Sequence, residues 1–420
     1  MKAEIIAVGS ELLTPDHIDT NSLFITQKLN ELGFEVHLKT VVGDNQDAIA
    51  GVLHSALGRS HLIIFSGGLG PTEDDRTRAA VAGALRRRIR VEPAILEALR
   101  RKFSSRGYPM PQINERQAEV IEGAEVLDNS VGTAPGMWLE QNGVYIVLLP
   151  GPPREMRAIF ETQVLPRARR LGKGRRLVTQ SFHVTGMTES EVDSRVAPIY
   201  ATFPSVRTTI LATPAHIALR LYQWVEEGGE PSDLQELSAR IQEELGDAIF
   251  TATGESLEEV VGQLLRRSGQ TLAVAESCTS GIIGMRVTRV PGSSDYFLGG
   301  VLCYSNALKR LFCGIPADLL AKHGAVSAEV AEALARGVRE RVGSSIGLSV
   351  TGIAGPGGGS QEKPVGLVYV GLSDRGRTIH LRKIVPGDRD TMRERTAYFA
   401  LSRLRKFLLE QPAVRPTSGK

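Results

Sequence analysis

The chain has 420 residues, enough for two to four domains at roughly 100–200 residues each. Hydrophobic residues make up 42% and charged residues 23%, which is typical of soluble globular proteins, and 50 basic residues nearly balance 47 acidic ones. This balance gives no electrostatic support for a nucleic-acid or membrane partner, and no apolar run reaches the roughly 18 residues of a transmembrane helix.

The chain has three cysteines, Cys278, Cys303 and Cys313, and no CxxC pair. This pattern argues against a disulfide framework and against a cysteine zinc site. Because disulfides are rare in a reducing compartment, it favours a cytoplasmic location.

Strands and helices alternate over residues 1–170, and Leu23, Leu29 and Leu32 are expected on one face of the first helix. The expected elements are a strand over 3–8, a helix from Asp19 or Thr20 to about Leu32, a strand ending at Asp44, a helix over 45–57, a strand over 61–66, a helix from about Arg76, and a strand and helix within 143–156. The alternation predicts an α/β domain with a parallel sheet and helices on both faces. Ligands of such sheets bind at the carboxyl ends of the strands.

A basic stretch over 167–176 is interpreted as a linker, and a small α+β module is expected over 171–252. Its expected elements are a strand over 177–187, a helix over 188–200, a strand over 216–225 and a helix over 232–246. The module has no Gly-x-x-Gly loop and no interleaved basic and aromatic residues, so a spacer or a dimerisation module is the simplest interpretation.

A third α/β domain is predicted over 253–414, with a frayed tail over 411–420. Its expected elements are helices over 256–269, to about Arg289, over 327–343 and over 388–410, strands over 270–277, 297–306 and 345–355, and a hairpin over 365–385. The strand over 270–277 ends in Glu276, Ser277, Cys278 and Thr279, and a glycine-bearing helix pattern follows. Such a corner suits a nucleophile or a phosphate ligand, because a helix amino terminus lies beside it.

The stretch "SGGLGPTEDD" (66–75) lies between a strand and a helix. Its glycines expose backbone N–H groups that can bind phosphate, but it is neither a Walker A loop nor a dinucleotide fingerprint. Glu73, Asp74 and Asp75 would repel a phosphate unless a cation lies between them, which suggests Mg²⁺ or a similar ion. Alternatively, these acids only cap the next helix. The stretch "PGPPREM" (150–156), which contains Glu155, is either the rigid border of a pocket or a simple strand–helix turn.

Long motifs in the right order resemble the CinA family of competence/damage-inducible proteins over nearly the whole chain. The motifs are "VGSELL", "DTNSLFITQKLNELGFEV", "VVGDN", "SGGLGPTEDDRT", "PGPPREM", "AESCTSG", "YSNALK", "HGAVS", "VTGIAGPGGGSQEKPVG" and "GDRD". The resemblance implies a molybdopterin-binding-like amino-terminal domain that acts as an ADP-ribose pyrophosphatase with a divalent metal (Mg, Co or Mn). It also implies a KH-type middle module and a carboxyl-terminal amidohydrolase domain that deamidates nicotinamide mononucleotide without a cofactor. A homodimer is expected, with no membrane or nucleic-acid partner.

The resemblance also implies site residues. Metal ligands are expected at Asp44, Asp74 and Asp75, with Glu155 a weaker candidate. Substrate contacts in the amino-terminal domain are expected at Gly9, Glu11, Asn21, Gly67, Gly68, Gly70, Thr72, Gly151 and Pro152. Those in the carboxyl-terminal domain are expected at Glu276, Thr279, Gly281, Asn306, Thr351, Gly352, Gly355, Gly357, Gly358 and Ser360.

Amide hydrolysis needs a nucleophile, a base and donors for the oxyanion. Cysteine is intrinsically the better nucleophile, but only as a thiolate, whereas the family resemblance favours Ser277 with Lys309 as its base. A lysine acts as a base only if its pKa falls. Arg389 would help as a nearby cation or bind the substrate phosphate, and Tyr304 would donate to the substrate or orient the lysine. The alternatives are that Cys278 is a small packed residue and that Tyr304 is ordinary core.

The glycine-rich stretch over 351–366 follows a strand, so its amides can bind the nucleotide phosphate or the oxyanion, with contacts from Ser360 and Lys363. It is expected to order on binding, and the alternative is a flexible linker. For the whole chain, two other functions stay open. One is a non-catalytic nucleotide-binding protein linked to DNA uptake, and the other is a protein that handles molybdopterin.

Overall fold

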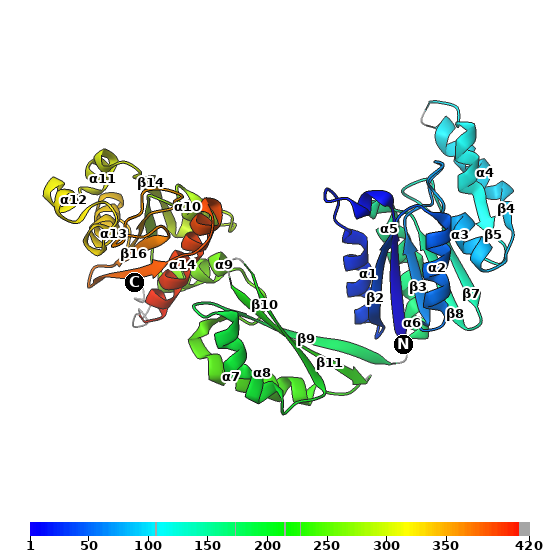
Figure 1. Ribbon diagram of the computed structural model, residues 1–420, viewed down its shortest axis with the longest axis horizontal. Helices are drawn as coiled ribbons and strands as arrows, with labels where there is room; N and C mark the ends of the chain where they lie inside the picture. Colours follow the sequence, from blue (N-terminus) through cyan, green and yellow to red (C-terminus); the bar gives the residue numbers. More distant parts are fainter. Residues whose placement is uncertain (106, 173, 214–215, 227, 411–420) are drawn as a thin grey trace, which may run out of the picture. The chain divides into compact units, whose positions relative to one another are not determined.

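The computed structural model describes residues 1–105, 107–172, 174–213, 216–226 and 228–410, so the predicted tail lies outside the described residues. The chain divides into two compact units (Figure 1). One comprises residues 1–178 and 223–231, and the other comprises 179–222 and 232–420. In the described ranges, no helix combines the length and the apolar character needed to cross a membrane.

The first unit is built on a six-stranded sheet with the order β2-β1-β3-β8-β7-β6. The strands are β1 (Lys2–Val8), β2 (Glu35–Val42), β3 (Leu62–Ser66), β6 (Glu125–Leu127), β7 (Gly136–Gln141) and β8 (Val144–Leu149). Neighbouring helices are α1 (Thr20–Glu31), α2 (Gln46–Leu57), α3 (Thr77–Ala84), α5 (Pro153–Ile159) and α6 (Leu165–Leu171). One core joins the sheet to α2 and α3, and another joins it to α1, α5 and α6, so helices cover both faces.

The prediction of a parallel sheet is corrected to a mixed sheet. Strands β1, β2, β3 and β8 are parallel, but β7 pairs antiparallel with β8 and with β6. The cause is a tight turn at Asn142 (φ 50°) and Gly143 (φ 77°). Two residues with positive φ, most often Asn-Gly, make the turn that joins antiparallel strands. The sequence therefore contained the hairpin signal, between two apolar runs.

Two smaller predictions fail, the first only in part. Asp19 caps α1 through Ser22 N (2.9 Å), as expected. Leu29 is buried and Leu32 packs against the same core, as predicted, but Leu23 is 58% exposed and Ile25 is buried instead. The basic stretch over 167–176 is no linker, because α6 runs to Leu171 and the next strand begins at Arg175. Ala168 is buried against the sheet, so the arginines form the outer face of a packed helix.

The first unit also contains three elements outside its six-stranded sheet, namely β4 (Ile89–Val91), α4 (Pro93–Ser104) and β5 (Glu119–Ile121).

A small α+β module follows the first domain in the chain. The module has a four-stranded sheet with the order β10-β11-β9-β12. Its elements are β9 (Arg175–Val184), α7 (Glu189–Tyr200), β10 (Val206–Ala212), β11 (Ile217–Glu226), α8 (Ser232–Leu245) and β12 (Ile249–Thr251). The two predicted helices are present, strand β10 was not predicted, and the KH type stays a prediction.

The last part of the chain forms a five-stranded sheet with the order β14-β13-β15-β16-β17. The strands are β13 (Leu272–Glu276), β14 (Phe297–Leu302), β15 (Ile346–Gly352), β16 (Leu367–Ser373) and β17 (Thr378–Ile384). The helices are α9 (Leu257–Ser268), α10 (Ile282–Thr288), α11 (Asn306–Cys313), α12 (Ala317–His323), α13 (Ala328–Val342) and α14 (Arg389–Leu409). Strand β13 is parallel to β14 and β15, and the predicted hairpin is β16–β17.

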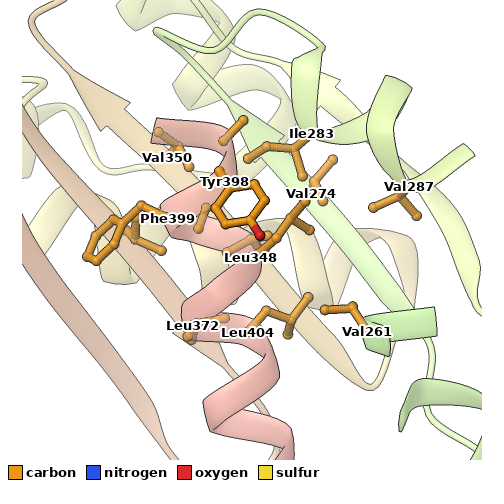
Figure 2. Close-up of a cluster of buried hydrophobic side chains, with 14 of the residues drawn as sticks. Val261, Val274, Ile283, Val287, Leu348, Val350, Leu372, Tyr398, Phe399 and Leu404 are labelled. Carbon is orange, nitrogen blue, oxygen red and sulfur yellow. The ribbon is translucent and has the colours of Figure 1, made fainter. Parts of the chain in front are cut away.

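Two cores enclose this sheet. Helices α9, α10 and α14 pack on one face, where Val261, Leu348 and Leu404 meet (Figure 2). Helices α11, α12 and α13 pack on the other face around Leu334. The carboxyl end of β13 is therefore held between two packed layers, and the residue that follows it has a fixed position.

We expect Leu348→Ala to lower the free energy of local opening of β15 by about 2–5 kcal/mol, because Leu348 is fully buried on a central strand and its loss leaves a cavity. Hydrogen exchange of the amides over 346–352 measures this change. The matched control is Leu298→Ala on the edge strand β14, where the side chain is 48% exposed and the effect should stay within about 0.5 kcal/mol. Equal effects of the two substitutions would contradict the central position of β15.

Candidate functional site

The C-terminal candidate site lies where three parallel strands end. Glu276, the last residue of β13, pairs with Leu302 on one side and Val350 on the other. Ser277 and Tyr304 follow β13 and β14, and Thr351 lies near the end of β15, so the sheet brings together residues that lie far apart in the sequence. This is the edge at which such sheets bind ligands.

Ser277 and Lys309 are in contact, as the sequence predicted for a nucleophile and its base. Lys309 Nζ lies 3.2 Å from Ser277 Oγ, 2.8 Å from Cys303 O and 2.9 Å from Tyr304 O. Lys309 is only 1% exposed and Ser277 7%. Burial lowers the pKa of Lys309 below its ordinary value, which favours the neutral amine.

Glu276 stabilises the turn between β13 and α10. Its carboxylate accepts hydrogen bonds from Gly281 N (2.9 Å), Ile283 N (3.2 Å) and Gly284 N (2.9 Å), the first N–H groups of α10. A buried carboxylate at this place is stabilised by the helix dipole and by three donors. Both carboxylate oxygens therefore accept hydrogen bonds from the backbone. Glu276 stabilises this turn, and its contact with substrate stays a prediction.

Cys278 packs in the core on the α14 side of the sheet. Burial raises the pKa of its thiol to about 12, so the thiolate is scarce at neutral pH. Thr279 is also fully buried, and its Oγ1 has no hydrogen-bond partner among the described residues. The geometry at this corner thus favours Ser277 among the three possible nucleophiles.

Tyr304 and Arg389 lie at the open side of the site. The Tyr304 side chain is 61% exposed, so it is not ordinary core. Arg389 begins α14 and donates to Tyr304 Oη (3.3 Å) and to Gly355 O (2.6 Å). The arginine therefore connects the helix, the tyrosine and the glycine-rich loop.

Arg393, one turn further along α14, was not predicted from the sequence. Its Nε donates to Cys278 O (3.2 Å) and its Nη2 to Thr279 O (3.5 Å). The available signal was the spacing of Arg389 and Arg393, which places both side chains on one helix face.

The other predicted residues of this site surround the corner. Asn306 begins α11, Thr351 Oγ1 donates to Ala325 O (2.7 Å), and Gly352 ends β15. Ser360 and Lys363 hold one turn of the loop, because Ser360 N donates to Lys363 O (2.8 Å). Lys363 Nζ in turn donates to His323 O (2.7 Å), so this lysine is anchored to the end of α12. The loop also contains Gly357 and Gly358, which are exposed.

The second candidate site is a cavity of about 580 Å³ in the amino-terminal domain. Its lining includes most of the residues predicted there, namely Gly9, Glu11, Asp44, Gly67, Gly68, Gly70, Asp74, Asp75, Gly151, Pro152 and Glu155. Gly67 is required by close packing, since a Cβ there would lie 2.0 Å from Val8 O. Gln117 and Thr133 also line the cavity and are joined by a hydrogen bond of 3.0 Å. Gln117 lies in a 3₁₀ helix (Gln112–Ala118) and Thr133 in a loop, and neither was predicted because no sequence motif marks them.

Asn21 and Thr72 hold the loops around this cavity and are not part of its lining. Asn21 Nδ2 donates to Ser66 Oγ (2.9 Å) and Gly151 O (2.8 Å). Asp75 accepts hydrogen bonds from Gly70 N (2.7 Å), Thr72 N (2.8 Å) and Thr72 Oγ1 (2.5 Å). The carboxylate of Asp75 is therefore used within the loop.

The donors around the cavity suit a hard divalent cation, since they are carboxylate oxygens. Asp44 is partly engaged, because its Oδ2 accepts from Ser10 N (2.7 Å), and a hydrogen bond from Thr72 lowers the pKa of Asp74. In the described part of the chain, no three His, Cys, Asp or Glu side chains are gathered closely enough to hold a metal ion. The chemistry thus fits Mg²⁺ or a similar ion that takes further ligands from substrate phosphate and water.

Two known protein families match this chain, one in each half. Residues 254–408 match the family described as CinA C-terminal domain, and residues 4–170 match the family described as probable molybdopterin binding domain. A CinA-like protein of Koribacter versatilis is 46% identical over 97% of this chain and 100% of its own length. A putative competence-damage inducible protein of Moorella thermoacetica is 43% identical over 98% and 100%.

Among solved structures, the protein CinA of Thermoplasma acidophilum, titled as having unknown function, is 32% identical over 40% of this chain and 97% of its own, with a TM-score of 0.37. The sequence relatives span the chain from end to end. The chain therefore belongs to the CinA-like family of competence/damage-inducible proteins.

Proposed function

We propose that the carboxyl-terminal domain hydrolyses nicotinamide mononucleotide to nicotinate mononucleotide and ammonia, with Ser277 as nucleophile and Lys309 as base. The observation that carries this proposal is the contact of 3.2 Å between Lys309 Nζ and Ser277 Oγ in a buried setting. A serine is a weak nucleophile unless an adjacent base takes its proton.

Burial, which lowers the pKa of Lys309, favours a neutral amine, and the three hydrogen-bond contacts of Nζ can accommodate one. A neutral amine has two N–H donors and one lone pair, whereas an ammonium has three donors and no acceptor. Cys303 O and Tyr304 O take two donors, which leaves the lone pair for the hydroxyl of Ser277. Each N–H group of a neutral Lys309 amine thus has a carbonyl acceptor, and its lone pair can accept the hydrogen of the Ser277 hydroxyl.

The reaction follows from this arrangement. Ser277 Oγ attacks the carboxamide carbon while its proton moves to Lys309 Nζ. The tetrahedral intermediate collapses, the C–N bond breaks, and the proton on Lys309 passes to the leaving nitrogen to give ammonia. A water then attacks the acyl ester, again with Lys309 as base, and frees Ser277. The backbone N–H groups of the turn after Ser277 are the proposed oxyanion donors.

Arg389 is the proposed anchor for the substrate phosphate. Its bonds to Gly355 O and Tyr304 Oη use two of five guanidinium donors, which leaves others for phosphate oxygens. The loop over 351–366 lies beside it, and its exposed Ser360 is a further candidate contact. No cofactor is needed for this reaction.

We also propose that the amino-terminal domain hydrolyses ADP-ribose to AMP and ribose 5-phosphate with a divalent metal ion (Mg, Co or Mn). The support is the cavity of about 580 Å³ that combines glycine-rich turns with carboxylates. Asp74 and Asp44 are the proposed ligands of the ion, and Asp75 orients the loop that carries Asp74. When bound, the ion would offset the charge of the pyrophosphate and act as a Lewis acid. The homodimer and the cytoplasmic location stay predictions.

We expect Ser277→Ala to lower ammonia release from nicotinamide mononucleotide by roughly 10³-fold or more, since the attacking oxygen is lost. Lys309→Met should lower it by about 10²–10⁴-fold, because no base remains. Cys278→Ala is the matched control and should stay active, since Cys278 only packs. Activity that survives Ser277→Ala would refute the serine mechanism, and no ammonia from the unchanged protein would refute the amidase.

The pH profile of kcat/KM tests the base separately. Lys309 works only when it is deprotonated, so activity should rise with pH through its folded-state pKa and level off above it. Because burial lowers that pKa, the rise should come at a lower pH than for an exposed lysine. A rate that falls across this range, or an unchanged rise in Lys309→Met, would assign the base to another group.

For the amino-terminal domain, we expect AMP formation from ADP-ribose to need added Mg²⁺, Mn²⁺ or Co²⁺ and to stop on chelation. Asp74→Asn should lower it by roughly tenfold or more, since one metal ligand is lost. Glu73→Gln is the control, because Glu73 lies in the same loop, pairs with Arg116 and does not line the cavity. Binding of ADP-ribose or molybdopterin without hydrolysis at any of these metals would favour the non-catalytic alternative.

A further inference from the structure

A third cavity, of about 420 Å³, lies apart from both candidate sites. It is inside the second compact unit, between the small α+β module and the last domain. Its walls come from the turn before α7 and the first residues of that helix, from the ends of β10 and β11, and from β17 and α14. The lining residues from the last four elements include His216, Lys383, Arg395, Tyr398 and Phe399. Pockets that bind small molecules have about this size and often lie between domains.

Side-chain contacts hold the walls together. Thr185 Oγ1 lies 2.9 Å from Ser402 Oγ. Arg405 donates to Asp247 O and Ile249 O, at 2.8 Å each. The cavity is therefore part of a packed unit with defined walls.

One side of the cavity is aromatic. His216 stacks on His183, with ring centroids 4.5 Å apart at 30°, and lies 6.0 Å from Tyr398 at 25°. Burial lowers the pKa of His216, so its ring is neutral at pH 7 and can stack without carrying charge. Tyr398 and Phe399 are neighbours on α14 (Figure 2), and both line the cavity. Such a wall suits a planar ring.

The cavity also has cationic side chains, which lie close to the Phe399 ring. Lys383 and Arg395 line the cavity, and Arg403 lies beside them, since Lys383 Nζ and Arg403 Cζ are 4.8 and 5.0 Å from the centre of the Phe399 ring. Throughout the described ranges, none of these three cations has a carboxylate within 4.0 Å.

Two carboxylates also line the cavity and offset part of this positive charge. Glu191 Oε2 accepts hydrogen bonds from Thr188 N (2.6 Å) and Thr188 Oγ1 (2.9 Å), and its charge attracts Lys383. Glu189 is exposed in the first turn of α7. The three cations outnumber the two carboxylates, so a net positive charge remains for an anion, and phosphate is the anion that Arg and Lys bind best.

We propose that this cavity binds a ring-bearing monophosphate of mononucleotide size, with its phosphate on Lys383 and Arg395 and its ring on the wall of His216, Tyr398 and Phe399. The ligand would contact α14, the helix whose first turns carry Arg389 and Arg393 to the Ser277 corner. The binding site does not depend on either proposed activity.

AMP is the probe, and the histidine ring signals of the full chain are the readout. The protein is labelled with ¹³C at histidine Cε1, and the signal of His216 is assigned with His216→Gln. We expect AMP to shift this signal in a saturable way, and ribose 5-phosphate, which lacks the ring, to bind more weakly. Lys383→Gln combined with Arg395→Gln should weaken AMP binding about tenfold or more at this signal.

The matched control is Arg382→Gln, which removes a charge from the same strand outside the cavity and should leave the His216 shift unchanged. Unchanged signals of His323 and His380, which lie in the same unit outside the cavity, show that this unit is folded in the double variant without ligand. The proposal is overturned if only signals of residues 1–170 respond to AMP. It is equally overturned if the double variant keeps the affinity of the unchanged protein.

Discussion

The C-terminal candidate site depends on the contacts of the buried amino group of Lys309. Burial makes an ammonium ion costly in this position, because none of the ion pairs among the described residues gives Lys309 a carboxylate, and it thereby lowers the pKa of the lysine. The hydrogen-bond partners of Nζ are Ser277 Oγ, Cys303 O and Tyr304 O. Two of the partners are backbone carbonyls after β14, so the position of the amine is set by the sheet. Ser277, the proposed nucleophile, follows β13, the neighbouring strand. Strand pairing therefore brings the serine and the lysine into contact, although 32 positions separate them in the chain.

The corner itself is held by backbone requirements that explain its residue types. Ser280 has φ 46° and Gly281 φ 94°, so the chain turns through the left-handed region before α10 begins. Glu276 satisfies three N–H groups that this turn leaves without partners. Gly352 leaves room for the turn, because a Cβ there would lie 3.1 Å from Cys278 Sγ and 2.6 Å from a Val368 methyl group. The strained turn, the buried carboxylate of Glu276 and the close packing at Gly352 thus fix the position of the Ser277 hydroxyl.

The sequence predicted most of the regular elements, because their signals are local. Buried strands, the Asp19 cap and the amphipathic helices depend on neighbouring residues. The pairing of Ser277 with Lys309 came from family resemblance and not from spacing, since strand order is a non-local property. Tyr304 shows the same limit, because its exposed side chain follows an edge strand that no local pattern identifies. By contrast, the turn at Asn142 and Gly143 is a local signal for the antiparallel pairing of β7 with β8. The sequence therefore contained the information that the predicted parallel sheet overlooked.

Asp74 and Asp75 show how adjacent identical residues can differ in chemistry. Asp75 turns into its own loop and takes three hydrogen bonds, whereas the cavity keeps Asp74 available. Sequence alone could not separate them, because the direction of each side chain depends on the loop backbone. With Asp75 occupied and Asp44 partly engaged, no three carboxylates of the described residues are gathered closely enough to hold a metal ion. The proposed divalent ion would then take several of its oxygen ligands from water and from the pyrophosphate. In that proposal, metal binding and nucleotide binding depend on each other.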